Sequence, residues 1–267
     1  MNVKKHLTLT RAGIIESLQF RLSSLVIIAG NFIYLIIVYY LWKAIYASVD
    51  TESVNGMTFS DTLIYLVLAT SLFGFMEMYL VWQMGRDIQS GKIILDISKP
   101  MKYMPFMFWS LSGSVVMSFI MTFIPTFVAV YFLTNGAIHL GINILFFLIS
   151  VVFAIIINFS IDFFIGTVCL YTESIWGINI MKEVIVLLLS GATIPIAFFP
   201  EPLKTIVLYL PFQSIYNVPL TILTKSEMPV EEVFKMMLTQ VFWAAAAMFI
   251  STLFWKKSLK VITVNGG

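Results

Sequence analysis

Two carboxylates, Glu77 and Asp162, lie inside long apolar segments, where an ionised group is costly. Each lies about seven residues from one end of its segment, a depth of roughly 10 Å at 1.5 Å of helical rise per residue. Acids at such a depth mark pathways for ions or substrates by default. We therefore expect the pair to line a polar inner vestibule or gate. The alternative is a structural role, with the acids protonated or hydrogen-bonded to neighbours such as Asn158 or to the backbone.

The chain lacks the phosphate-binding loop of an ATPase. The stretch QSGKI at 89–93 contains the Gly-Lys pair of that loop, but Gly85 lies six residues before Gly91, whereas the motif needs five. In addition, Lys92 is followed by isoleucine where that motif needs serine or threonine. We expect no ATP binding by this chain.

The remaining reactive side chains are too few and too scattered for a catalytic or metal site. His6 and His139 fall on opposite sides of the membrane in the topology argued below, which disfavours a paired-histidine metal site or a Ser-His dyad. Cys169 is the only cysteine, so the chain forms neither an intrachain disulfide nor a cysteine metal cluster. We expect no catalytic residue, no metal and no cofactor on this chain.

The elements that position these residues are predicted to be membrane-spanning helices. The chain is 60% hydrophobic and 11% charged, whereas soluble domains carry about 25% charged residues. Its mean hydropathy is +0.95. A span needs about 20 apolar residues, and the sequence predicts six: 23–42, 62–84, 108–133, 142–168, 175–198 and 233–255. We expect an all-α polytopic protein with one transmembrane domain over residues 1–267.

The distribution of lysine and arginine predicts the orientation. Positive residues near span ends stay on the cytoplasmic side. With the N-terminus inside, the outer side receives only four of the 16 basic residues, Lys43, Lys204, Lys225 and Lys235. Both termini are therefore predicted to be cytoplasmic, as an even number of spans requires.

Residues 1–22 precede the first span. Leu7, Ile14, Ile15 and Leu18 share one helical face, which predicts a helix lying in the membrane interface. The alternative is a solvated leader that runs straight into the first span.

Residues 85–105 form the longest cytoplasmic connection between spans. Arg86 and Asp87 continue the second helix inward and Gly91 ends it. Ile93, Ile94 and Ile97 then offer an apolar surface that can dock a soluble partner. Pro100 ends this segment.

Residues 190–219 carry five prolines in a stretch that stays apolar. Each proline removes a backbone donor, and interrupted backbone is tolerated at membrane depth only within protein or beside water. A helix between Pro202 and Pro211 would be only about 13 Å long. A second short helix fits 214–223. We expect a re-entrant hairpin over 198–225 on the outer side.

Two stretches of the chain resemble those of a known family. DIQSGKIILDISKPM at 87–101 is similar to the cytoplasmic "dI.sG.i...LlrP" segment of ABC-2 permeases, the membrane subunits of type-2 ABC exporters. GATIPIAFFPEPLKTIVLYLPF at 191–212 resembles their "G..iPl.ffP..l..i...lPf" block. The resemblance covers essentially the whole chain and is strongest with the six-span branch.

The resemblance implies a transport subunit without its own ATPase. Two copies of a cytoplasmic ABC ATPase, carrying ATP and Mg, would dock on 85–105, and a second permease copy or a related permease would complete the pathway. The implied coupling residues are Arg86, Asp87, Gly91, Lys92, Ile93, Ile94, Lys99 and Pro100. The implied pathway or gate residues are Glu77, Asp162, Pro195, Phe198, Phe199, Pro200, Pro211 and Phe212.

We expect an exporter permease of the plasma membrane that contacts lipids and no nucleic acid. Its apolar spans, which carry few charges, suit an amphipathic drug, peptide or lipid-like cargo. The alternatives are a secondary transporter, which needs more ion-coupling residues and often an internal repeat, and an anchoring or immunity protein, for which the five-proline hairpin is hard to explain.

Overall fold

The computed structural model describes residues 3–19, 21–49, 53–134, 138, 141–172, 175–225 and 228–261. The predicted position of His139 and residues 1, 2 and 20 of the predicted N-terminal helix lie outside the described residues.

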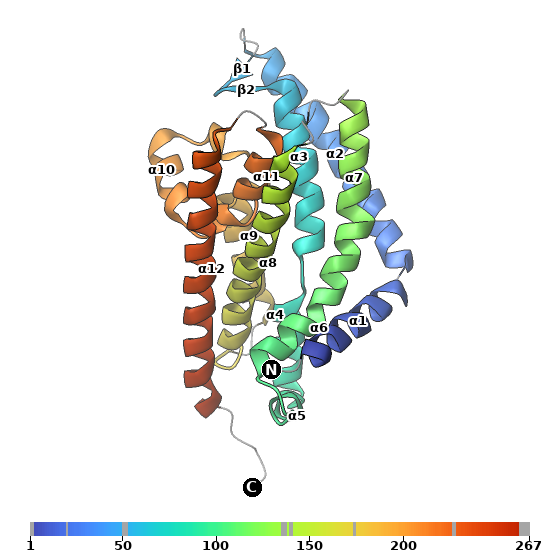
Figure 1. The fold of residues 1–267 in the computed structure, drawn as a ribbon, viewed down its shortest axis with the longest axis vertical. Helices are drawn as coiled ribbons and strands as arrows, with labels where there is room; N and C mark the ends of the chain where they lie inside the picture. Colours follow the sequence, from blue (N-terminus) through green and yellow to red (C-terminus); the bar gives the residue numbers. More distant parts are fainter. Residues whose placement is uncertain are drawn as a thin grey trace.

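Nearly all regular structure in the described ranges is helical (Figure 1). The α-helices are α1 (Val3–Gln19), α2 (Arg21–Ala47), α3 (Phe59–Met76), α4 (Leu80–Gln89), α5 (Ile93–Ile97), α6 (Tyr103–Ser118), α7 (Ile124–Leu133), α8 (Ile142–Val168), α9 (Ile175–Leu189), α10 (Glu201–Tyr209), α11 (Asn217–Thr224) and α12 (Val230–Ser258). The described residues also form short 3₁₀ turns and one π-helical stretch, Phe119–Phe123, which lies between α6 and α7. The strands β1 (Ser53–Val54) and β2 (Met57–Thr58) are the one departure from helix, joined by an Asn-Gly turn with both residues at positive φ.

Four stretches among the described residues are long and apolar enough to cross a membrane, namely Phe59–Gln89, Tyr103–Leu133, Ile142–Val168 and Val230–Val261. They coincide with four of the predicted spans. α2 and α9 lie where the first and fifth spans were predicted. The chain is therefore an all-α, multi-pass membrane protein.

Two predicted spans differ from the observed helices. The second was predicted as one helix over 62–84, but α3 ends at Met76 and α4 begins at Leu80. The fifth was predicted to reach residue 198, but α9 ends at Leu189 and Gly191 follows at φ +82°. At 1.5 Å per residue α9 is only about 22 Å long, so this chain has two interrupted segments within its apolar layer.

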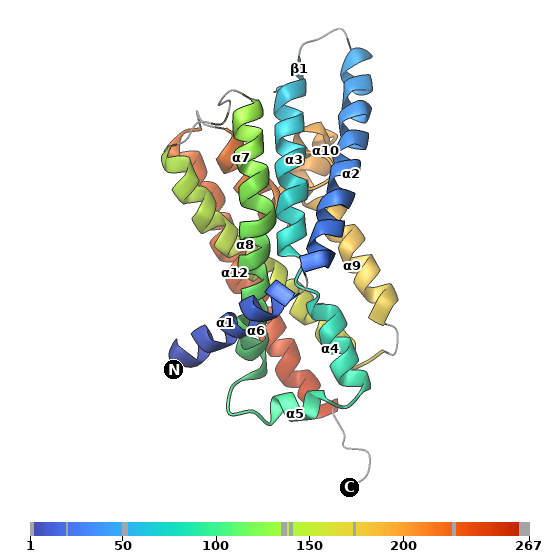
Figure 2. The ribbon, with the colours of Figure 1, turned by 90° about the vertical axis from the view of Figure 1, so that its right-hand side faces the viewer.

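α1 lies crosswise to the bundle, against α6 (Figures 1 and 2). The two helices meet where Gly13 faces Gly113, because a Cβ on either glycine would fall within 2.6 Å of backbone atoms on the other helix. Thr10 Oγ1 donates to the Trp109 carbonyl at 3.3 Å, and the His6 and Trp109 rings lie 5.2 Å apart. The predicted N-terminal helix is thus present and seated on protein along one side.

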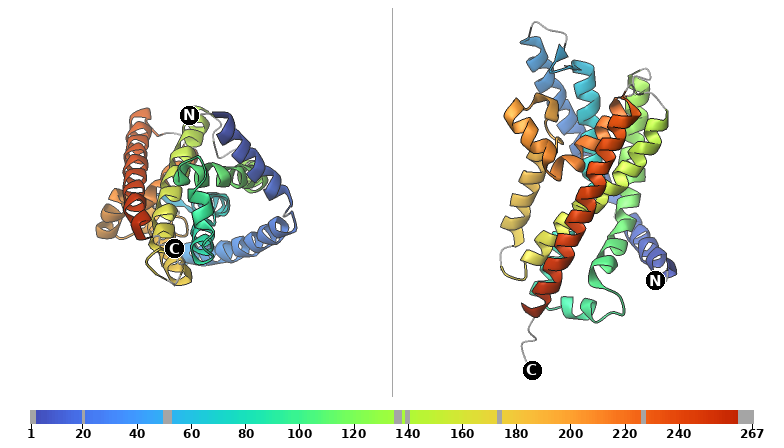
Figure 3. Two further views of the ribbon diagram at one scale, coloured as in Figure 1. Left: turned by 90° about the horizontal axis from the view of Figure 1, so that it is seen from below. Right: turned by 60° about the vertical axis from the view of Figure 1, so that its left-hand side comes forward.

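α12 runs along α8 for most of its length (Figure 3). The helices are joined by hydrogen bonds inside the apolar layer. Ser251 Oγ donates to the Ser160 carbonyl at 2.6 Å, and Gln240 Nε2 donates to the Ser150 carbonyl at 3.2 Å. Gln240 also donates at 2.8 Å to the Ser214 carbonyl, beyond α10. These bonds fix the segment 201–224 against the α8–α12 pair.

The two ends of the bundle differ. α5, the start of α1 and the end of α12 lie in one half, while β1, β2 and α10 lie in the other (Figures 1 and 2). α3 starts with a capping box at that second end: Thr58 Oγ1 accepts from the Asp61 amide at 3.1 Å, and Asp61 Oδ2 accepts from the Thr58 amide at 3.0 Å.

Candidate functional site

The interruption between α3 and α4 is the first feature of the site. Glu77 leaves the helix in an extended conformation with ψ 104°, and Tyr79 starts α4 at φ +51°. Positive φ is a true outlier for a bulky residue. Asn158 of α8 donates its Nδ2 proton to the Met76 carbonyl at 3.0 Å, which satisfies one backbone acceptor freed by the break. Discontinuous spans of this kind form binding sites in transporters.

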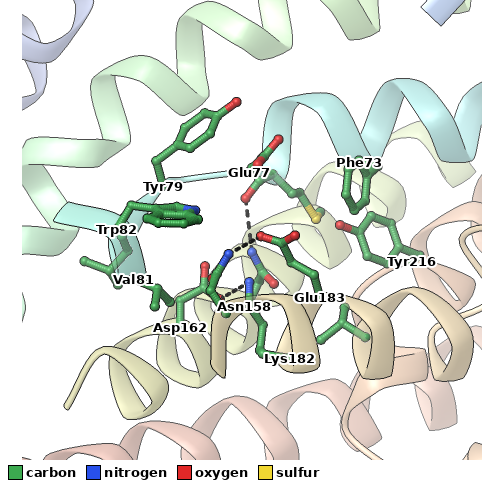
Figure 4. A pocket seen from close by; sticks show the side chains of 14 residues that line it. Phe73, Glu77, Tyr79, Val81, Trp82, Asn158, Asp162, Lys182, Glu183 and Tyr216 are labelled. Atoms are coloured by element: carbon green, nitrogen blue, oxygen red, sulfur yellow. Dashed lines mark hydrogen bonds and ion pairs between the residues drawn. The ribbon is translucent and has the colours of Figure 1, made fainter. Parts of the chain in front are cut away.

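A charged cluster surrounds this break (Figure 4). Lys182 Nζ lies 2.9 Å from Asp162 Oδ1, and Asn179 donates to Glu183. Glu77, Asp162, Lys182 and Glu183 line one small cavity of about 30 Å³. A cavity of that size holds about one water molecule.

The members of this polar pocket differ in burial. Asp162 and Asn179 are buried, Lys182 and Glu183 are partly buried, and Glu77 is exposed. The aromatic side chains around them are Phe73, Tyr79, Trp82 and Tyr216. The pocket therefore has a closed floor on α8 and an open mouth at the break.

The sequence predicts that Glu77 and Asp162 share one polar vestibule, and the two residues line one pocket. In the alternative structural role, Asn158 would hydrogen-bond the acids, but its amide donates to the Met76 carbonyl. Lys182 and Glu183 were missed. They fall inside the predicted span 175–198, so the test that singled out Glu77, an ionisable group in an apolar segment, would have found them too.

The predicted gate residues of the proline-rich segment do not gather at this pocket. Phe198 packs on Trp42 of α2, with ring centroids 4.7 Å apart, and Pro195 is buried beside it. Pro211 and Phe212 line an apolar groove between α8, α9 and α12, and this groove shares Lys182 with the polar pocket. Phe199 is partly buried and Pro200 is exposed. The predicted gate residues thus do not form one group: Glu77 and Asp162 line the polar pocket, Phe198 lies on α2, and Pro211 and Phe212 line the apolar groove.

The predicted coupling segment contains α5, but its exposed face is not the predicted one. Ile93 is buried and Ile94 packs partly against the core. Leu95, which the sequence analysis did not select, is 68% exposed. The prediction that Ile93 belongs to an exposed apolar surface is wrong, because the short helix α5 turns it toward the bundle. Ile94 and Ile97 are partly exposed, and docking on residues 85–105 stays a prediction.

The charged residues of this segment hold its shape. Gly91 has φ +72° and its amide donates to the Ile88 carbonyl at 3.1 Å, so it ends α4 as predicted. Lys92 lies 3.7 Å from buried Asp87, and Lys99 lies 2.6 Å from buried Asp96. We define the coupling surface as the exposed residues Arg86, Gln89, Ser90, Lys92, Leu95, Ser98, Lys99 and Pro100.

The apolar helices, the interrupted span and the charged pocket at its break together define a polytopic protein of the transporter class. The family described as "ABC-2 family transporter protein" matches residues 32–266. The chain belongs to this family and is an ABC-transporter permease, the membrane-spanning component of the transport system. A search of curated proteins finds no match for the chain.

Proposed function

We propose that this chain is the permease subunit of an exporter driven by a separate cytoplasmic ATPase. Two permeases, identical or related, form the pathway, and two ATPases dock on the coupling surface with ATP and Mg bound to them. The permease sits in the plasma membrane with six spans and both termini inside. Family membership supports the class, and three features of the molecule support the details.

The exposed carboxylate of Glu77 is the observation that carries the proposal of a paired pathway. An ionisable side chain that faced lipid at this depth would be costly. Tyr79, next to it, is also 56% exposed. A second permease across this face would enclose water around Glu77 and make the break part of an aqueous path. The neighbouring helices α2 and α9 would then lie beside the same path (Figure 2).

α4 and α5 supply the proposed link to the ATPase. The break at 77–79 separates α4 from α3, so force on α5 can move α4 without bending a continuous span. α4 packs tightly on its neighbours: a Cβ on Gly85 would lie 2.4 Å from Ile175, and one on Gly166 would lie 2.6 Å from Met84. Motion of α4 would therefore reach α8 and α9, which carry Asp162 and Lys182 of the polar pocket.

The segment 198–225 is proposed to re-enter the membrane from the outer side and act as an exit lid. Its short helices α10 and α11 are too short to cross, and Gln240 anchors the turn between them to α12. Ile206 and Tyr209 of α10 are 60% and 77% exposed. Such exposed apolar side chains can contact lipid or the lid of the second permease.

The test replaces the exposed apolar residue of the coupling surface. Leu95→Glu should abolish co-purification of the ATPase encoded with this permease, and substrate-stimulated ATP hydrolysis with it, because docking would bury a carboxylate. Leu133→Glu is the matched control, since Leu133 is 82% exposed at the end of α7, in the half of the bundle away from α5.

Loss of the ATPase from Leu95→Glu but not from Leu133→Glu supports the proposal. If both variants keep the ATPase, residues 85–105 are not the docking segment. If wild-type permease recovers no ATPase and a proton gradient alone drives transport, the chain is not an exporter permease of this kind.

A further inference from the structure

The polar pocket at the α3–α4 break has an excess of negative charge. Glu77, Asp162 and Glu183 contribute three carboxylates, whereas Lys182 is the only cation of the described residues that lines it. Lys182 lies against Asp162 at 2.9 Å. The two glutamates therefore lack a matching positive charge, in surroundings where uncompensated charge is costly.

A second observation points to a ligand. Tyr216 is only 3% exposed and lines the same pocket. Its hydroxyl is directed into the pocket, toward Glu183 in the view of Figure 4, and forms no hydrogen bond within the described part of the chain. A hydroxyl that faces a small polar cavity without a hydrogen bond to a described side chain is available to a bound group.

The size and surroundings of the pocket restrict the ligand. No group of three or more His, Cys, Asp or Glu residues among those described is arranged to hold a metal ion. The cavity of about 30 Å³ accepts a group the size of a water molecule, such as a primary ammonium. Trp82 and Tyr79 place aromatic rings beside the carboxylates, a combination that favours organic cations.

An apolar groove shares one lining residue with the polar pocket. It has a volume of about 360 Å³ and is lined by Tyr34, Thr70, Phe73, Leu187, Ala192 and Thr193. Phe73 belongs to both hollows. Its lining residues Thr70 and Phe73 belong to α3, Leu187 belongs to α9, and Ala192 and Thr193 follow α9. A molecule with its head among the carboxylates could thus lay an apolar tail along this groove.

We propose that this permease binds amphiphiles with a primary ammonium head group, held by Glu77 and Glu183 with the Tyr216 hydroxyl as a further partner. That these amphiphiles are the exported cargo rests on the proposed function. Their binding to the pocket does not, because the permease alone forms the site. The ammonium donates hydrogen bonds to the two carboxylates and to the phenol oxygen, which restores the missing positive charge.

The test titrates full-length permease in zwitterionic nanodiscs with octylamine, octyltrimethylammonium and octyl sulfate. Tryptophan fluorescence reports binding because Trp82 lines the pocket. Octylamine should bind at least tenfold more tightly than the other two, since the trimethylammonium head exceeds the cavity and the sulfate has the wrong charge. Empty nanodiscs correct for partition of the tails.

Variants locate the site. Glu77→Gln and Glu183→Gln should each weaken octylamine binding about tenfold, the loss of one charge-assisted contact. Glu232→Gln, on the exposed first turn of α12, is the matched control and should leave it unchanged. Equal binding of the three probes, or unchanged binding in both pocket variants, overturns the proposal.

This outcome is separate from that of the proposed function. If octylamine fails to bind while the ATPase still docks through Leu95, only the cargo inference is wrong. If octylamine binds as expected while no ATPase associates, the site stands and the exporter proposal falls.

Discussion

The close crossing of α1 and α6 gives the most quantitative prediction. In Gly113→Ala the new Cβ would lie 2.3 Å from the Thr10 carbonyl oxygen and 2.5 Å from the Ile14 amide nitrogen. Both are backbone atoms and cannot rotate away. An ordinary contact needs about 3.4 Å, so α1 must move by roughly 1 Å.

The cost follows from two opposing terms. Forcing an extra methyl into a packed site costs about 1–3 kcal/mol, while Gly→Ala inside a helix contributes about 1 kcal/mol in its favour. Gly30→Ala in α2 isolates the second term, because nothing lies within 4 Å of its added Cβ. We expect Gly113→Ala to be about 2 kcal/mol less stable than Gly30→Ala.

Hydrogen exchange of the α1 peptide is the direct assay. A loss of about 2 kcal/mol in the docking of α1 should speed its exchange by a factor of about 25. The contacts that would weaken are the Thr10 bond to the Trp109 carbonyl and the His6–Trp109 ring contact. Unchanged exchange of residues 3–19 in Gly113→Ala would refute the reasoning, because α1 would then not depend on the glycine crossing.

Three further predictions concern the interior and the coupling segment. Lys182→Met should destabilise the protein by about 3 kcal/mol in thermal unfolding, because it leaves the three carboxylates of the polar pocket without a cation. Asp162→Asn should destabilise it by clearly less. Equal effects of the two substitutions would contradict an excess of negative charge in the pocket. Gly91→Ala should cost about 1 kcal/mol through its φ of +72° alone, since nothing lies within 4 Å of an added Cβ. Gly91→Asn should cost less, and the reverse order in thermal unfolding would argue against a left-handed Gly91. Gln240→Leu should lose about 1 kcal/mol with its bonds to two carbonyls. The partly buried control Thr239→Leu should not, because the Thr239 hydroxyl bonds only within α12. Similar melting temperatures would show that the Gln240 bonds contribute little.

The sequence predicted much of the secondary structure because local signals dominate there. Continuous apolar runs gave the helices at 142–168 and 230–258 within a few residues. Gly91 was identified as a helix end because glycine adopts positive φ without steric cost, and the two short helices of the proline-rich segment followed from the proline spacing. The family itself was predicted from two short stretches, and the match over residues 32–266 confirms it.

The face of a short helix could not be predicted in the same way. α5 has only five residues, too few for an apolar period to define a side. The exposed side of α5 depends on how α4 and α6 hold the two ends of this helix. In the fold, Ile93 is buried against the bundle and Leu95 is exposed.

By itself, the sequence determined that this protein is a helical membrane protein, where most of its spans lie and that Glu77 and Asp162 are unusual within them. Only the tertiary structure decided that the second span breaks at 77–79, where a carbonyl freed by the break accepts a hydrogen bond from Asn158, 82 positions away along the chain. It also decided that Lys182 and Glu183 join the two acids. Charges from the α3–α4 break, α8 and α9 form one pocket only when packing brings these three segments together. The low polarity around them then makes an unpaired charge costly.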